Sequence, residues 1–326
     1  MSQSPFTQMQ RAVDIVGASP HPANKIAATL FGRDKQGADF SISRTNYWPA
    51  PLCAHVGTDT LIGNSSGTIH AETACILDAP FTDEATLCVT DPFCPNCAKN
   101  IAEAGIRTIY IDHKGFAKDF AKRRGDQFEN MSMRICARAG IDVFSLNRKE
   151  ESCDPILKTP DKFTPYEDNP VKLIPLPDAS YDSFATFVHG AAALHKGRRF
   201  AAAAATDPGG KTYGIVCRPH PAIGYSMQYD TDEIENKGGK YSFIQEPINR
   251  ILMNVPRHGL RIMPDMVFCT HVPTSREQVN MVGAGITRLF IADLRKARDD
   301  FALQAMTMLG AKNIIRYDTF QPLSEA

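Results

Sequence analysis

The chain has 326 residues, 43% hydrophobic and 22% charged, which is enough apolar material for two domains of about 150 residues each. Lysine plus arginine equals aspartate plus glutamate at 36 each, and this balance does not favour wrapping around a nucleic-acid backbone. The sequence shows no signal-peptide pattern and no run of about 18 apolar residues, and its nine cysteines fit a reducing compartment; we therefore expect a cytoplasmic protein without a membrane span.

The first predicted elements form a hairpin followed by a strand, a helix and a strand. Residues 26–31 and 40–43 are two β-rich runs separated by a turn that glycines bound. A short apolar strand at residues 87–90 precedes a helix of about ten residues and a further β-rich run at residues 108–111. Gly105 closes the helix, because glycine is favoured just past a helix C-terminus.

The second half of the chain repeats this pattern. Residues 89–111 align without a gap with residues 269–291, at a separation of 180 positions. The identical pairs are Thr90/Thr270, Asn100/Asn280, Ala104/Ala284, Gly105/Gly285, Ile106/Ile286 and Ile111/Ile291. Residues 131–143 and 301–315 each read as a helix that ends at glycine and leads into a strand, and residues 213–217 are the expected counterpart of the hairpin.

Strands that alternate with helices are typical of a layered α/β sheet. The repeat therefore predicts two tandem domains, residues 1–155 and residues 179–326. The linker between them is expected at residues 156–178, where proline and charged residues gather without clear periodicity. We interpret a second polar stretch, residues 229–240, as an exposed loop of the second domain.

The strongest chemical motif is a histidine and a glutamate followed by a pair of cysteines: His70-Ala71-Glu72 and Cys94-Pro95-Asn96-Cys97. This arrangement is typical of zinc nucleobase deaminases. A catalytic zinc takes three protein ligands and keeps a fourth position for water, and His70, Cys94 and Cys97 supply those three. Both cysteines fall at a helix start, where backbone amides stabilise thiolate charge. Glu72 is placed to take the proton of the water and to pass protons to the ring nitrogen and the departing amine.

The alternative for these residues is a closed structural zinc site. Such a site needs a fourth protein ligand, and the nearest spare candidates are Cys53, Cys75 and Cys88. Cys75 falls on the helix of Glu72 and Cys88 falls in a buried-looking strand, so we interpret both as packing residues. A structural site also has no use for Glu72, which favours the catalytic interpretation.

Together with the sequence around it, the motif resembles the cytidine and deoxycytidylate deaminase superfamily, and the deoxycytidylate deaminase branch most closely. The resemblance rests on HAETACIL at residues 70–77, on residues 94–106 and on AGIDV at residues 139–143, and it covers residues 5–147. It implies a three-layer α/β/α cytidine-deaminase-like fold, present here in two tandem copies, and a Zn²⁺ cofactor.

The resemblance also implies the substrate contacts. Asn46 lies where the family places an asparagine that contacts the sugar, and Ala71, Pro92 and Phe93 are expected at the wall of the pocket. The chain departs from the family at one point, because the family has proline directly before the first cysteine whereas here Pro92 precedes Cys94 by two positions. This shift leaves the shape of the pocket wall, and hence the exact substrate, open.

The second copy has lost the metal ligands. Thr274 and Glu277 stand at the positions of the two cysteines, and Thr-x-x-Glu predicts a capping box at the start of a helix. Residues 244–246 are matched to residues 70–72, with a gap, which keeps a glutamate without a ligand beside it. We interpret this domain as a partner that covers the face an isolated deaminase domain would bury in an oligomer; the alternative is that it closes the pocket or binds a regulator.

The sequence predicts a zinc-dependent hydrolytic deaminase of a cytosine nucleotide or nucleoside, with the uracil product and ammonia. One alternative is deamination of another heterocycle, such as a purine or a pterin-like ring. Another is editing of a base in RNA or single-stranded DNA, which needs a basic groove and stacking aromatic side chains. A non-catalytic zinc scaffold would not need Glu72. The expected partners are the small-molecule substrate and, in a homodimer, a second copy of the chain, with no nucleic acid and no membrane.

Overall fold

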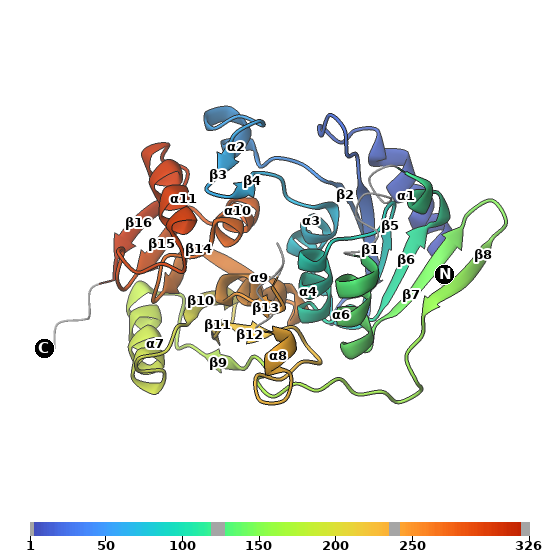
Figure 1. Ribbon diagram of the computed structural model, residues 1–326. Coiled ribbons are helices and arrows are strands. Elements are labelled where there is room, and N and C mark those ends of the chain that lie inside the picture. The colour runs from blue at the N-terminus through green and yellow to red at the C-terminus, as the bar shows by residue number, and fades with distance from the viewer. Residues whose placement is uncertain (1–2, 119–127, 235–241, 321–326) are drawn as a thin grey trace, which may run out of the picture.

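Two six-stranded mixed sheets organise the chain (Figure 1). The computed structural model describes residues 3–118, 128–234 and 242–320. In the order in which they lie side by side, the strands of the first sheet are β2 (Asp39–Thr45), β1 (Ala27–Arg33), β5 (Thr86–Val89), β6 (Thr108–Asp112), β7 (Asp142–Asn147) and β8 (Ser152–Leu157). Those of the second are β16 (Arg316–Thr319), β15 (Arg288–Ile291), β14 (Arg261–Cys269), β10 (Ala201–Thr206), β11 (Thr212–Cys217) and β9 (Leu173–Pro175).

The two sheets share one pairing pattern. In the first sheet β1 pairs antiparallel with β2 and β5, while β5, β6 and β7 run parallel. In the second sheet β10 pairs antiparallel with β11 and β14, while β14, β15 and β16 run parallel. A threonine hydroxyl accepts a backbone N–H at the same point of each sheet, Thr90 from Ala27 at 3.0 Å and Thr270 from Phe200 at 3.1 Å. The predicted α/β class is confirmed.

The connection between the two halves contributes an edge strand to each sheet. β8 pairs antiparallel with β7, and β9 pairs antiparallel with β11, because pairing satisfies the backbone groups of an otherwise open edge. The segment predicted as a linker, residues 156–178, therefore contains the end of β8 and the whole of β9. The domain limits at residues 155 and 179 stay predictions; the chain passes from one sheet to the other between Leu157 and Leu173.

Each sheet lies between helices. One helix, α1, covers the outer face of the first sheet and α7 covers that of the second, whereas α3, α4, α6 and α9, α10, α11 lie between the two sheets (Figure 1). Their bounds are α1 (Pro5–Val16), α3 (Ala71–Asp78), α4 (Pro95–Glu103), α6 (Met133–Arg138), α7 (Tyr181–Leu194), α9 (Pro247–Arg257), α10 (Ser275–Gly283) and α11 (Asp300–Ala311). A helix layer on both faces of each sheet is the three-layer arrangement that was expected.

Short elements complete the described part of the chain. They are α2 (Ala50–His55), β3 (Leu61–Ile62), β4 (Ser65–Ser66), the 3₁₀ turn η1 (His113–Ala117), the π-helical turn η2 (Phe128–Ser132), β12 (His220–Pro221), α8 (Thr231–Ile234) and β13 (Ile244–Gln245). Of the exposed loop expected at residues 229–240, residues 231–234 form α8 and residues 235–240 lie outside the described residues. Within the described ranges, no helix is both long and apolar enough to cross a membrane.

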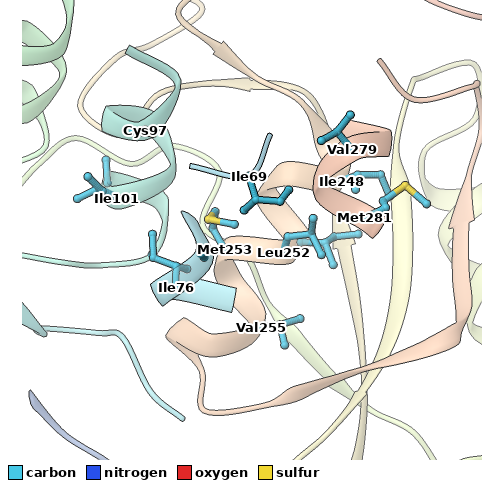
Figure 2. Close-up of a cluster of buried hydrophobic side chains, with 14 of the residues drawn as sticks. Ile69, Ile76, Cys97, Ile101, Ile248, Leu252, Met253, Val255, Val279 and Met281 are labelled. Atoms are coloured by element: carbon cyan, nitrogen blue, oxygen red, sulfur yellow. The ribbon is translucent and has the colours of Figure 1, made fainter. Parts of the chain in front are cut away.

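One apolar core joins the two halves (Figure 2). Ile76 of α3 and Ile101 of α4 lie beside Leu252 and Met253 of α9, and Met281 of α10 packs on the same cluster. Each of these side chains is at most 2% exposed, and burying a side chain of this size stabilises the fold by about 1.5–3 kcal/mol. The second half therefore covers the helix face that the first half would otherwise expose to water.

Proline and glycine mark the ends of the inner helices. Pro95 is the first residue of α4 and Pro247 the first residue of α9, a position that suits proline because its missing N–H would have no partner inside the helix. Gly105 and Gly285 follow the ends of α4 and α10 with φ angles of +76° and +75°. A Cβ atom on Gly105 would also lie 2.2 Å from the Asp83 carboxylate. The predicted glycine closures are confirmed.

Candidate metal centre

Two helix starts meet at one point between the sheets and bring three predicted ligands together. His70 is the N-cap residue of α3 and Cys94 is the N-cap residue of α4, with Cys97 in the first turn of α4. Nδ1 of His70 lies 3.6 Å from Sγ of Cys94 and 3.2 Å from Sγ of Cys97, and the three atoms all lie within 4.8 Å of one another. Because both helices point their N-termini at this spot, their free backbone amides favour negative charge on the sulfurs.

Backbone pairing fixes the segment that leads to the histidine. Ile69 forms an antiparallel bridge with Tyr47, with N···O distances of 2.7 and 3.1 Å, and the next residue begins α3. The loop that follows β5 starts at the C-terminal edge of the parallel strands and leads to the start of α4. The two ligand-bearing turns are therefore held by the sheet rather than by each other.

The charges of the three ligands depend on one another. The Cys97 thiol donates to the Cys94 sulfur, and this contact, with the nearby His70, holds the pKa of Cys94 well below its usual range although burial opposes it. Burial disfavours the imidazolium of His70, but the Cys94 thiolate outweighs it and raises the pKa of the imidazole. The set thus stabilises a thiolate, which is the form that binds metal.

Glu72 lies beside the ligands in the first turn of α3. Its side chain is 3% exposed, and its carboxylate is within hydrogen-bonding reach of the Cys97 thiol. Burial raises the pKa of Glu72, since a buried carboxylate loses hydration, and the positive His70 only partly opposes this. A carboxyl group whose pKa lies nearer neutrality is better suited to exchange protons with a substrate.

One imidazole and two thiols suit zinc in a catalytic arrangement. Among the described residues the cluster contains these three ligands and no fourth, which leaves one coordination position for a small molecule. The spare cysteines are engaged elsewhere: the Cys75 thiol donates to the Ala28 carbonyl at 3.3 Å, and the Cys88 thiol donates to the Pro5 carbonyl on the outer face of the sheet. Cys53 is exposed in α2.

The predicted substrate contacts have local partners of their own. The Asn46 side chain accepts from the Ser19 hydroxyl at 2.7 Å and from the Ile26 amide at 3.0 Å, and it donates to the Asn24 carbonyl at 2.8 Å. Asn46 therefore holds the loop before β1, and its contact with a sugar stays a prediction.

The other three predicted contacts are buried residues that are close in sequence to the ligands. Ala71 and Pro92 are buried, and Phe93 is 2% exposed. The Phe93 ring meets Phe128 edge to face with centroids 5.4 Å apart. These positions agree with an apolar pocket wall, and their contact with substrate stays a prediction.

Two further titratable side chains near His70, His21 and Arg276, carry no signal in the sequence pattern. His21 stacks on Trp48 with ring centroids 5.2 Å apart, and burial followed by the charge of His70 lowers the pKa of His21. Nε1 of Trp48 is buried without a hydrogen-bond partner in the described part of the chain. Arg276, which comes from the second half, donates to the Thr68 carbonyl at 2.8 Å. Only the packing of distant segments brings these groups to the ligands.

Among the described residues of the second half, no group of three metal-ligating side chains lies at the equivalent place. Thr274 caps α10 in a capping box with Glu277, as predicted, at the positions of Cys94 and Cys97. The N-cap residue of α9 is Glu246, so Glu246 rather than Ile244 takes the place of His70. The predicted match of residues 244–246 to residues 70–72 is therefore wrong by two positions, because the gap that it needs is two residues longer than the gap in the structure.

Two arginine side chains lie at this equivalent place in the second half. Arg199 forms an ion pair with Glu246, and Nη1 of Arg298 lies 2.7 Å from the other carboxylate oxygen of Glu246. Glu277 accepts from the Ile248 amide at 2.9 Å in addition to its capping bonds. The carboxylates that stand where the first half has its ligands are thus already neutralised or hydrogen-bonded.

A surface cavity of about 500 Å³ lies in the second half, between α11 and strands β15 and β16, with Met306 and Tyr317 in its lining. It contains none of the ligand residues of the first half, so its position says nothing about the metal centre.

Comparison with known proteins identifies relatives that match less than half of the chain. No family model matches the chain. A protein of Aliivibrio fischeri named "Uncharacterized deaminase in luxG 3′ region" is 29% identical over 140 residues, which are 42% of this chain and 88% of that protein. The dCMP deaminase of cyanophage S-TIM5 in complex with dCMP and dUMP is 20% identical, with a TM-score of 0.31, over 45% of this chain and 98% of that one. Its apo form is 20% identical over 44% and 97%, with a TM-score of 0.27. Over less than half of its length the chain is thus similar to a protein named as a deaminase.

Proposed function

We propose that the chain is a zinc-dependent hydrolytic deaminase of a cytosine nucleotide or nucleoside. The observation that carries this proposal is the cluster of His70 Nδ1, Cys94 Sγ and Cys97 Sγ within 4.8 Å, with the buried carboxyl group of Glu72 beside it. A scaffold site would be complete with a fourth ligand and would gain nothing from a buried glutamate, whose desolvation costs stability.

Zinc, when bound, would lower the pKa of a coordinated water and hold it at the open position. Glu72 would take one proton from the attacking water and deliver it to the ring nitrogen as the water oxygen forms a bond to the amino-bearing carbon. The same carboxylate would then take the second proton, from the hydroxyl group now on that carbon, and deliver it to the amine, so that the carbon–nitrogen bond breaks and ammonia leaves. Burial of Glu72 supports this shuttle, because it keeps bulk water from competing for the proton.

The substrate class rests on the apolar wall and on the relatives. A pocket lined by Ala71, Pro92 and Phe93 suits a flat heterocycle better than a strongly charged group. The cyanophage dCMP deaminase is named with dCMP and dUMP, which are the amine and the carbonyl forms of one pyrimidine. The equal numbers of basic and acidic residues weigh against a long nucleic-acid strand as substrate.

Ammonia release from cytosine, adenine, guanine and pterin compounds, each offered as base, nucleoside and nucleotide where available, tests the proposal. We expect the zinc-loaded protein to release ammonia from a cytosine compound and Glu72→Ala to lose a factor of about 10²–10⁴ in kcat while keeping its zinc. Glu150→Ala, which removes an exposed carboxylate in a turn, is the matched control and should retain full activity. Pure protein without zinc, or Glu72→Ala as active as the wild type, would refute the catalytic assignment; ammonia from a purine or pterin alone would change the substrate class.

A further inference from the structure

A buried chain of side chains links the second half of the protein to both ligand-bearing helices. Nε2 of Gln245 donates to Oδ1 of Asn100 at 2.6 Å, and Nδ2 of Asn100 donates to the Thr73 hydroxyl at 3.0 Å. The three residues are 2%, 4% and 3% exposed. Buried hydrogen bonds of this kind are directional, so they resist a shift of one helix along another. The apolar packing around them is non-directional and does not by itself fix how the helices are aligned.

The chain reaches the ligands through short stretches of helix. Thr73 follows Glu72 directly and lies three residues after His70, while Asn100 lies three residues after Cys97 on α4. A hydrogen bond between Thr73 and Asn100 therefore fixes the separation of the two helices that supply different ligands. Along the chain, α3 and α4 are connected only through β5 and the segments on either side of it.

The second half contains an equivalent of the hydrogen bond between Asn100 and Thr73, but among the described residues it has no equivalent of the one between Gln245 and Asn100. Nδ2 of Asn280 donates to Oδ1 of Asn249 at 2.9 Å, at the positions of Asn100 and Thr73. The residue that corresponds to Gln245 is Ile69, which precedes the N-cap of its helix in the same way but has no hydrogen-bonding side chain. Among the described residues, Asn100 near the metal ligands thus accepts a hydrogen bond from a side chain of the opposite half, whereas Asn280 does not.

Two more contacts from the second half hold the same region. Nζ of Lys99 on α4 donates to the carbonyls of Ser242 and Ile244 at 2.7 and 2.8 Å, next to Gln245. On the α3 side, Arg276 donates to the Thr68 carbonyl, two residues ahead of His70. The second half therefore contacts the backbone or side chains on both sides of the ligand cluster.

We propose that Gln245 and Asn100 are positioning residues for the metal centre, so that the second half sets the ligand geometry of the first half through Thr73. This inference rests on the proposed zinc site. It assigns the second half a task beyond covering an apolar face, because an apolar residue at position 245 would cover the face equally well.

Zinc loss to an excess of a chromogenic chelator, followed in time, tests the proposal together with the melting temperature. We expect Gln245→Leu and Asn100→Leu to release zinc about 10–100 times faster than the wild type, as is typical when groups behind metal ligands are removed, and to lower kcat with little change in KM. Asn280→Leu, which breaks the matching bridge in the second half, should lower the melting temperature and release zinc at the wild-type rate.

Substitutions of Thr73 guard against loss of folding as an explanation. Thr73→Val has nearly the same shape but no hydroxyl, and it should release zinc fast, whereas Thr73→Ser keeps the hydroxyl and should restore slow release. Equal zinc release from Asn100→Leu and Asn280→Leu, or wild-type release from Gln245→Leu, would overturn the positioning role while the zinc site stands. A wild-type protein that binds no zinc would instead overturn the proposed function, and this proposal with it.

Discussion

Replacing Glu103 with glutamine removes one charge from an ion pair that joins the two halves in the interior. Oε1 of Glu103 on α4 accepts from Nε of Arg250 on α9 at 3.0 Å and from Nδ2 of Asn254 at 2.7 Å. Both side chains of the pair are 2% exposed. The remaining guanidinium nitrogens of Arg250 donate to two backbone carbonyls, so among the described residues the carboxylate of Glu103 is the one anion within hydrogen-bond distance of this guanidinium.

The expected cost follows from this burial. Burial alone would lower the pKa of Arg250, but the charge of Glu103 and the charges near it raise that pKa, so the guanidinium stays charged in the interior. Breaking a buried pair by removing one partner costs about 3–5 kcal/mol, which is a large part of the 5–15 kcal/mol that roughly stabilises a domain. The double variant Glu103→Leu with Arg250→Met removes both charges, and we expect it to be within about 1 kcal/mol of the wild type or more stable.

Urea unfolding followed by two probes measures this cost. Trp48 is the chain's one tryptophan and reports the first half by fluorescence, while far-ultraviolet circular dichroism reports both halves. Because one core spans both halves, the two probes should give coincident transitions that Glu103→Gln shifts together. A loss below about 1 kcal/mol in the free energy of unfolding, or two separate transitions in the wild type, would refute the reasoning.

Three further predictions concern single sites. Removing zinc with a chelator should lower the melting temperature of the wild type but not that of Cys94→Ser, and zinc affinity should weaken as the pH falls, because His70 and the thiols must be deprotonated to bind; a melting curve with and without chelator checks this. Thr274→Ala should cost about 0.5–2 kcal/mol in urea unfolding through loss of the cap of α10, with unchanged zinc content. Burial opposes ionisation of Asp318, but Arg288 and Arg316 outweigh it and lower the pKa of Asp318 below the ordinary value near 4. The stabilisation by the Asp318 carboxylate is therefore present at neutral pH and is lost as the pH falls through the pKa of the folded state. Asp318→Asn should therefore cost about 0.2–1 kcal/mol at pH 7, and this difference should vanish at acid pH.

The ligand cluster could be predicted because each part of it is local in sequence. Cys94 and Cys97 are separated by one helical turn, and His70 and Glu72 lie at the start of another helix. The repeat of 180 positions predicts the strand–helix–strand pattern of the second half in the same way, and Thr90 and Thr270 make the same backbone contact in the structure. Spacing within one element or one repeat is enough for both results.

The contacts between the halves could not be predicted from spacing. Gln245 meets Asn100 across 145 positions, and Arg276 meets Thr68 across 208 positions. Spacing also misses the equivalence of Glu246 and His70, because α9 and β14 are longer than α3 and β5 and no shared residue marks the gap. Such pairs depend on how two surfaces pack, which residue patterns along one chain do not encode.

In the second half, the place equivalent to the ligand cluster differs in more than three residues. Arg199 and Arg298 supply positive charge at Glu246, where the first half has His70. Changing Glu246→His, Thr274→Cys and Glu277→Cys would restore the three donor types but leave these guanidinium groups next to a divalent cation, without their carboxylate. Like charges in a partly buried place repel, so we expect this triple variant to bind one zinc per chain, and a second only after Arg199→Ala is added. Zinc per chain, measured after dialysis, decides the matter: two zinc ions in the triple variant would show that ligand identity alone separates the two halves.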